Sequence, residues 1–73
     1  MNDKDFLISI RDGLKSKNQK LQRKTLGKIQ DLNVSSISNP NVLNILSDML
    51  DFYIQTDQSM IEQAMSAFKH ILG

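Results

Sequence analysis

The stretch LKSKNQKLQRKTLGKI, residues 14–29, decides the fold because apolar residues return at helical spacing on both sides of a polar turn. We expect Gly13 and the following Lys-Ser-Lys-Asn run to end one helix, and Asn18 to cap the next. The residues expected on the apolar side of this next helix are Leu21, Thr25, Leu26, Ile29 and Leu32. The stretch therefore predicts a helical hairpin, in which two amphipathic helices are joined by a short turn.

The residues before the turn supply the first helix of this hairpin. Its N-cap is expected at Asn2 or Asp3. Its apolar residues are Phe6, Leu7, Ile10 and Leu14. After the hairpin, the polar segment NVSSISNP, residues 33–40, indicates a connection that places Pro40 at the first position of a third helix.

Two further helices are predicted in the second half. The apolar residues of the third helix are Val42, Leu43, Ile45, Leu46, Met49, Leu50, Phe52 and Tyr53. The fourth helix begins near TDQSMIE, where Ser59 and Glu62 have the spacing of a capping box and Asp57 is a rival cap. The expected fold class is therefore all-α, with four helices.

A shift of 39 residues superposes the second half of the chain on the first. The shift places Asp57 on Asn18, so that the two expected caps align. The apolar residues that it pairs are Phe6 with Ile45, Leu7 with Leu46, Ile10 with Met49, Leu14 with Tyr53, Leu21 with Met60, Leu26 with Met65, Ile29 with Phe68 and Leu32 with Ile71. A period of about 40 residues is typical of repeated helical hairpins.

The stretch 14–29 resembles the turn and second helix of a HEAT/armadillo-like repeat, where an apolar helix end, a polar turn, an apolar residue and an arginine follow one another. Those places are taken here by Leu14, Asn18, Leu21 and Arg23. In the second half, Glu62 stands in the place of Arg23. The expected architecture is two antiparallel hairpins, residues 1–34 and 40–73, joined by a linker at 35–39 and stacked as a short HEAT-like solenoid. A small four-helix bundle is the alternative.

Length and composition describe one small domain. With 73 residues, the chain can bury only about 60% of the surface that its unfolded form exposes. There is no cysteine to form a stabilising disulfide, and the longest apolar runs, such as Phe6–Ile8, are too short to span a bilayer or to form a secretory signal. We expect a cytoplasmic protein, with a nuclear location left open.

The sequence lacks the parts of a catalytic or metal site. His70 is the single histidine, and one histidine without cysteine cannot form a zinc site of the usual type. Asp48 and Asp51 lie three residues apart on a predicted helix, where a solvated stripe explains them better than an acid–base pair. We expect no enzymatic activity, no cofactor and no metal.

The charges are unevenly divided between the halves. Residues 1–34 hold eight basic and four acidic residues, a net charge of +4, whereas residues 35–73 hold one basic and four acidic residues, a net charge of −3. The basic face, as we name it, comprises Lys17, Lys20, Arg23, Lys24 and Lys28. Like charges four residues apart destabilise a helix by a few tenths of a kcal/mol per pair, which indicates that something other than helix stability placed them there. A merely solvated helix face is the alternative to a binding role.

The resemblance implies a non-catalytic protein-interaction or scaffold module. The basic face would then bind an acidic protein, with nucleic-acid phosphate as the alternative ligand; against nucleic acid, no aromatic residue is interleaved with the lysines. A homo-oligomeric helical bundle is a further alternative. No membrane association is expected.

The fourth helix is apolar over more than one face. Met60, Ala64 and Ile71 are expected to face the third helix, which leaves a second group pointing away from it. We name this group the apolar flank; it comprises Ile61, Met65 and Leu72. Because the end repeats of an array normally have a polar outer face, we expect the flank to contact a further repeat of a longer chain or a second copy in a two-fold dimer.

Overall fold

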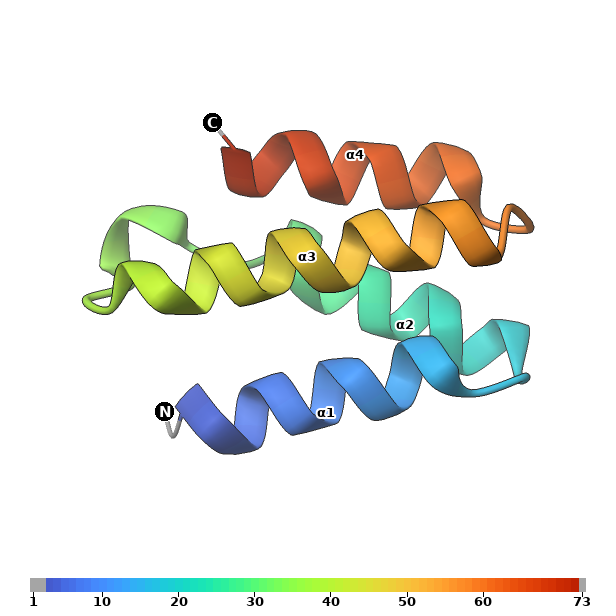
Figure 1. Ribbon diagram of the computed structural model, residues 1–73, viewed down its shortest axis with the longest axis horizontal. Coiled ribbons are helices and arrows are strands. Elements are labelled where there is room, and N and C mark those ends of the chain that lie inside the picture. Colours follow the sequence, from blue (N-terminus) through green and yellow to red (C-terminus); the bar gives the residue numbers. More distant parts are fainter. Residues whose placement is uncertain (1–2, 73) are drawn as a thin grey trace.

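The computed structural model describes residues 3–72, and this part of the chain is built from helices (Figure 1). Its four α-helices and one short 3₁₀ helix are α1 (Asp3–Lys15), α2 (Gln19–Gln30), η1 (Val34–Ser36), α3 (Pro40–Thr56) and α4 (Ile61–Leu72). The expected all-α fold with four helices is confirmed.

The helices form two antiparallel hairpins that stack on each other. In Figure 1, α1 and α3 run in one direction, and α2 and α4 run in the other. Besides the contacts within each hairpin, α1 packs against α3 and α2 packs against α4. Neighbours in different hairpins are therefore parallel, whereas neighbours in an up-and-down bundle are antiparallel. The four helices also enclose a single core, so the broader description of a small four-helix bundle fits as well.

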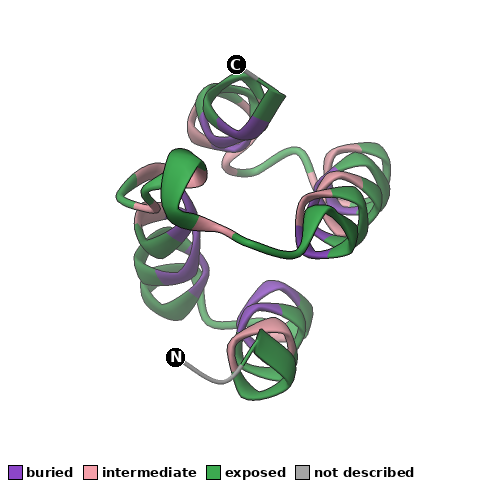
Figure 2. Cartoon of the chain, turned by 90° about the vertical axis from the view of Figure 1, so that its left-hand side faces the viewer, coloured by how far each residue is buried: buried purple, intermediate pink, exposed green. Residues whose placement is uncertain are grey.

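All four helices contribute to this core. Viewed along the helices, with α1 at the bottom and α4 at the top, Figure 2 shows their buried sides turned toward a common interior. The buried apolar residues are Ile10, Leu14, Leu26, Ile29, Val42, Leu46, Leu50, Tyr53, Ala64, Ala67 and Ile71. The hairpins are also joined by polar contacts, because the Nε2 of Gln63 on α4 donates to the backbone oxygen of Arg23 and to the Oε1 of Gln30, at 3.1 Å each.

The beginnings of α2 and α3 agree with the sequence. The Oδ1 of Asn18 accepts from the backbone N–H groups of Lys20 and Leu21, at 2.9 and 3.3 Å, which is the expected N-cap of α2. Pro40 is the first residue of α3, and the Oδ1 of Asn39 accepts from the N–H of Asn41. At the start of α1, Asp3 lies in the first helical turn, and the alternative cap Asn2 lies outside the described residues.

The first helix ends at the start of the Lys-Ser-Lys-Asn run, as expected, whereas the expectation that Gly13 helps to end it is wrong. The helix α1 continues to Lys15, and Gly13 is buried within its last turn. A Cβ atom at Gly13 would lie 1.9 Å from the Oγ1 and 2.9 Å from the Cβ of Thr25 on α2. Gly13 is therefore required by the close approach of two helices, and its role as a helix breaker is secondary.

The predicted capping box at the fourth helix is also wrong. Instead of bonding to the helix, the Oγ of Ser59 donates to the Oδ1 of Asp57 at 2.7 Å, and the backbone N–H of Ser59 donates to the same oxygen at 3.0 Å. The residues between Asp57 and Ile61 form a turn, and α4 begins after it. Asp57, the rival cap, thus organises the turn that leads into α4.

Candidate interaction surfaces

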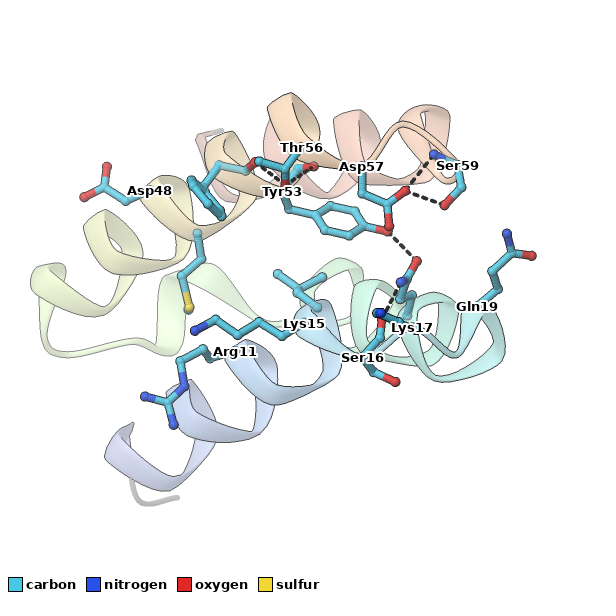
Figure 3. Close-up of a pocket in the computed structure, with 14 residues that line it drawn as sticks. Arg11, Lys15, Ser16, Lys17, Gln19, Asp48, Tyr53, Thr56, Asp57 and Ser59 are labelled. Atoms are coloured by element: carbon cyan, nitrogen blue, oxygen red, sulfur yellow. Dashed lines mark hydrogen bonds between the residues drawn. The ribbon is translucent and has the colours of Figure 1, made fainter.

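A groove of about 930 Å³ lies between the two hairpins, at the end of the molecule where both hairpins turn (Figure 3). Its floor is apolar and contains Leu14, Met49 and Tyr53 together with Phe52, whose side chain is 65% exposed. The cations Arg11, Lys15 and Lys17 line the wall formed by α1 and the turn after it, and the acids Asp48 and Asp57 line the wall formed by α3 and its end.

Sequence reasoning missed this groove because it placed Phe52 in the buried stripe of α3. Phe52 and Ile45 are both largely exposed. The exposure of Phe52 could have been recognised from its neighbours on the helix surface. Asp48 lies four residues before it and Gln55 three residues after it, and both are exposed. Leu21 was likewise expected on the apolar side of its helix, and it is 42% exposed.

A buried polar network holds the inner end of the groove. The hydroxyl of Tyr53 donates to the Oε1 of Gln22 at 2.9 Å, and the Nε2 of Gln22 donates to the backbone oxygen of Ser16. Burial raises the pKa of Tyr53, and the negative charge of Asp57 raises that pKa further. The tyrosine therefore remains a protonated hydrogen-bond donor, and it connects α3 to α2 and to the turn of the first hairpin.

Asp57 is occupied by the turn that it organises. The two hydrogen bonds from Ser59 stabilise its carboxylate and lower the pKa of Asp57, with the side-chain bond having the larger effect. A carboxylate with a lowered pKa is a poor general base. Asp57 thus belongs to the structural frame of the groove.

The basic face is exposed to solvent. All five of its residues, Lys17, Lys20, Arg23, Lys24 and Lys28, are exposed. Among the described residues, no acidic side chain forms a salt bridge with any of them, and the one salt bridge found there joins Arg11 to Asp12. Lys17 also lines the groove, so the positive charge of α2 continues into the groove wall.

The apolar flank is exposed to a large extent. Met65 is 48% exposed and Leu72 is 63% exposed, whereas Ile61 is partly buried. The residues expected to face α3 are more covered, because Ala64 and Ile71 are buried and Met60 is partly buried. Burial is therefore greater at Ala64 and Ile71 than at Met65 and Leu72, while Met60 and Ile61 are both partly buried.

The residues considered for catalysis have separate contacts or surroundings. The Nε2 of exposed His70 contacts the backbone oxygen of Leu32 at 2.6 Å, so it must carry the hydrogen and donate. The Oδ2 of Asp51 accepts from the Nε2 of Gln55 at 3.0 Å, while Asp48 lines the groove. Over residues 3–72, no three histidine, aspartate or glutamate side chains are grouped so that they could hold a metal ion.

Comparisons with protein-family models, with curated proteins and with solved structures found no match to this chain. None of the helices within residues 3–72 combines the length and the apolar character needed to cross a membrane. The geometry of the three surfaces is therefore the basis for the function proposed below.

Proposed function

We propose that this chain is a non-catalytic protein-binding module whose basic face binds an acidic protein partner. The observation that carries the proposal is the exposure of Lys17, Lys20, Arg23, Lys24 and Lys28 without an acidic counterpart in the described part of the chain. The lysines at 20, 24 and 28 follow one another along one side of α2 and repel each other in the free protein. An acidic partner removes this repulsion and gains charge-assisted contacts.

The groove extends this surface and adds an apolar component. Because Lys17 belongs to both surfaces, an acidic segment lying along α2 can continue past Lys17 toward Phe52 and Met49. Exposed aromatic side chains in a concave site are typical anchors of protein interfaces. The partner segment that fits best is therefore acidic and carries an apolar side chain near one end.

This arrangement supports a protein partner better than nucleic acid. Bases are usually held by aromatic side chains interleaved with the cations, and none lies among the residues of the basic face. Phe52, the exposed aromatic residue, lies in the groove on α3 and not on α2.

The test uses capture from cell extract with the intact chain and a triple variant, Lys20→Glu, Lys24→Glu and Lys28→Glu. We expect the intact chain to retain acidic proteins that cross-link to α2. The triple variant should no longer retain them. The matched control replaces the same three lysines by arginine, which preserves the charge and should preserve capture. Equal capture by all three chains contradicts the proposal.

Titrations with duplex and single-stranded nucleic acid distinguish protein binding by the basic face from the alternative of nucleic-acid binding. Binding through phosphates gives a logarithmic salt slope of about −0.9 per contact on duplex DNA. We expect flat titrations at low salt. A steep, salt-dependent affinity that the triple variant loses would instead assign the basic face to nucleic acid.

A further inference from the structure

One side of α4 is only partly covered by the rest of the described chain, although it is apolar along its whole length. The opposite side faces α2, since Gln63 donates to the backbone of Arg23 and His70 donates to the backbone of Leu32, which follows α2. The side away from α2 carries four apolar residues, which we name the α4 seam: Ile61, Met65, Phe68 and Leu72. All four are partly or largely exposed.

In the first hairpin, the helix that corresponds to α4 is α2, and α2 is covered by a further helix. By the shift of 39 residues, Met65 and Phe68 on α4 correspond to Leu26 and Ile29 on α2. Leu26 and Ile29 are fully buried, and α4 packs against their helix. On α4, Met65 is exposed and Phe68 is only partly buried, packed at one edge against the core. Within residues 3–72 the seam thus has the character of an incompletely covered helix–helix contact.

The spacing within the seam is that of two helices packed side by side. Its members are separated by four, three and four residues, which is the alternation of a coiled-coil interface. The seam spans the whole of α4, and 12 residues of helix measure about 18 Å. A second helix of the same kind therefore fits along its full length.

The charged residues beside the seam favour a second copy of the same chain as the partner, with the two α4 helices antiparallel. Glu62 and Lys69 occupy equivalent positions on one edge of the seam, seven residues apart. When two such helices pack antiparallel, this edge meets the same edge of the other helix, so Glu62 of each copy lies near Lys69 of the other. Parallel packing does not bring these two residues together. The α4 helix is thus complementary to itself in the antiparallel direction.

We propose that two copies of this chain associate through the α4 seam, with the helices antiparallel about a two-fold axis and with Glu62 of each copy facing Lys69 of the other. This contact lies on the side of α4 away from α2, so it is separate from the basic face and goes beyond the function proposed above. A single helix pair is a small interface, and we expect a reversible dimer with a dissociation constant on the order of 10–100 μM.

The first test is sedimentation equilibrium on the intact chain from about 1 μM to about 1 mM. We expect a monomer–dimer equilibrium that Met65→Glu weakens at least tenfold. The matched control is Ser66→Glu, which adds the same charge to the neighbouring exposed position outside the seam and should leave the equilibrium unchanged. A monomer throughout the range overturns the proposal and leaves the seam to a different protein or a further hairpin. Equal association of the two variants overturns it as well.

The second test addresses the antiparallel direction through charge reversal. Glu62→Lys and Lys69→Glu each place two pairs of like charges in the dimer, so each variant alone should associate roughly fivefold more weakly at low salt. An equimolar mixture of the two variants restores opposite charges at both contacts and should recover the affinity. Circular dichroism verifies that each variant stays helical. A mixture that associates no better than the separate variants refutes the antiparallel arrangement.

Discussion

Replacing Gly13 by alanine should destabilise the protein, although alanine is the better helix former. A Cβ atom at Gly13 would meet the Oγ1 of Thr25 at 1.9 Å and the Cβ of Thr25 at 2.9 Å. Rotation of the Thr25 side chain moves its Oγ1 but leaves its Cβ in place, so it cannot remove the clash. The helices α1 and α2 must therefore move apart where they now touch.

The expected change in the free energy of unfolding is the difference between two opposing effects. Forcing an extra methyl group into a packed contact costs about 1–3 kcal/mol. Alanine regains about 0.5–1 kcal/mol relative to glycine inside a helix. The net loss for Gly13→Ala is therefore about 0–2.5 kcal/mol. For a domain of this size, a change of 1 kcal/mol shifts Tm by about 4–8 °C.

Gly27 provides a matched control within the same hairpin. It lies inside α2, and a Cβ atom there would have nothing within 4 Å. Gly27→Ala should therefore raise the free energy of unfolding by about 0.5–1 kcal/mol. In thermal and urea unfolding followed by circular dichroism, the unfolding midpoint of Gly13→Ala should lie below that of the parent protein and the midpoint of Gly27→Ala above it. If Gly13→Ala is as stabilising as Gly27→Ala, the reasoning about the helix contact is refuted.

Three further predictions concern the polar contacts. Tyr53→Phe leaves the buried Oε1 of Gln22 without its donor and should cost about 1–3 kcal/mol in urea unfolding, and an unchanged midpoint would contradict this. Asn18→Ala removes the cap of α2 and should lower stability by about 1 kcal/mol, whereas Asn44→Ala on the exposed side of α3 should not lower it; equal effects would refute the capping role. Because the pKa of Asp57 is lowered from 3.8 in the folded protein, its contribution to stability is present above that pH and is lost as the pH falls below it. Thermal unfolding between about pH 5 and about pH 2 should show a steeper loss than for Asp57→Asn, and parallel curves would contradict the assignment.

Local sequence signals predicted the helices and two of their starts. Asn18 caps α2 and Pro40 opens α3, because capping and the fixed φ of proline depend only on residues close by in the chain. The stacking of the hairpins was also predictable from the 39-residue shift. Most of the buried apolar residues follow from the amphipathic pattern, with Leu21, Ile45 and Phe52 as exposed exceptions. These features are set by short-range chemistry and by periodicity.

Features that depend on contacts between helices were not predictable. The role of Gly13 depends on Thr25, which is 12 residues away on another helix. Ser59 has the spacing of a capping residue, yet the carboxylate of Asp57 is the stronger acceptor for its hydroxyl and backbone N–H. The apolar character of Phe52 predicts a core position, yet it is 65% exposed, because neither α1 nor α4, the helices that pack against α3, covers it.

The difference between the hairpins explains why the exposed Phe52 and the α4 seam belong to the second one. By the shift of 39 residues, Gly13 and Thr25 of the first hairpin correspond to Phe52 and Ala64 of the second. Glycine allows α1 to approach α2 at this position, whereas a phenylalanine side chain is far too large for such a contact and lines the groove instead. On the other helix of each hairpin, Leu26 is fully buried and its helix packs against α4, while its counterpart Met65 is 48% exposed. The second hairpin therefore exposes at both helices the apolar positions that the first one buries, and this is the physical reason to seek its contacts with other molecules at Phe52 and along α4.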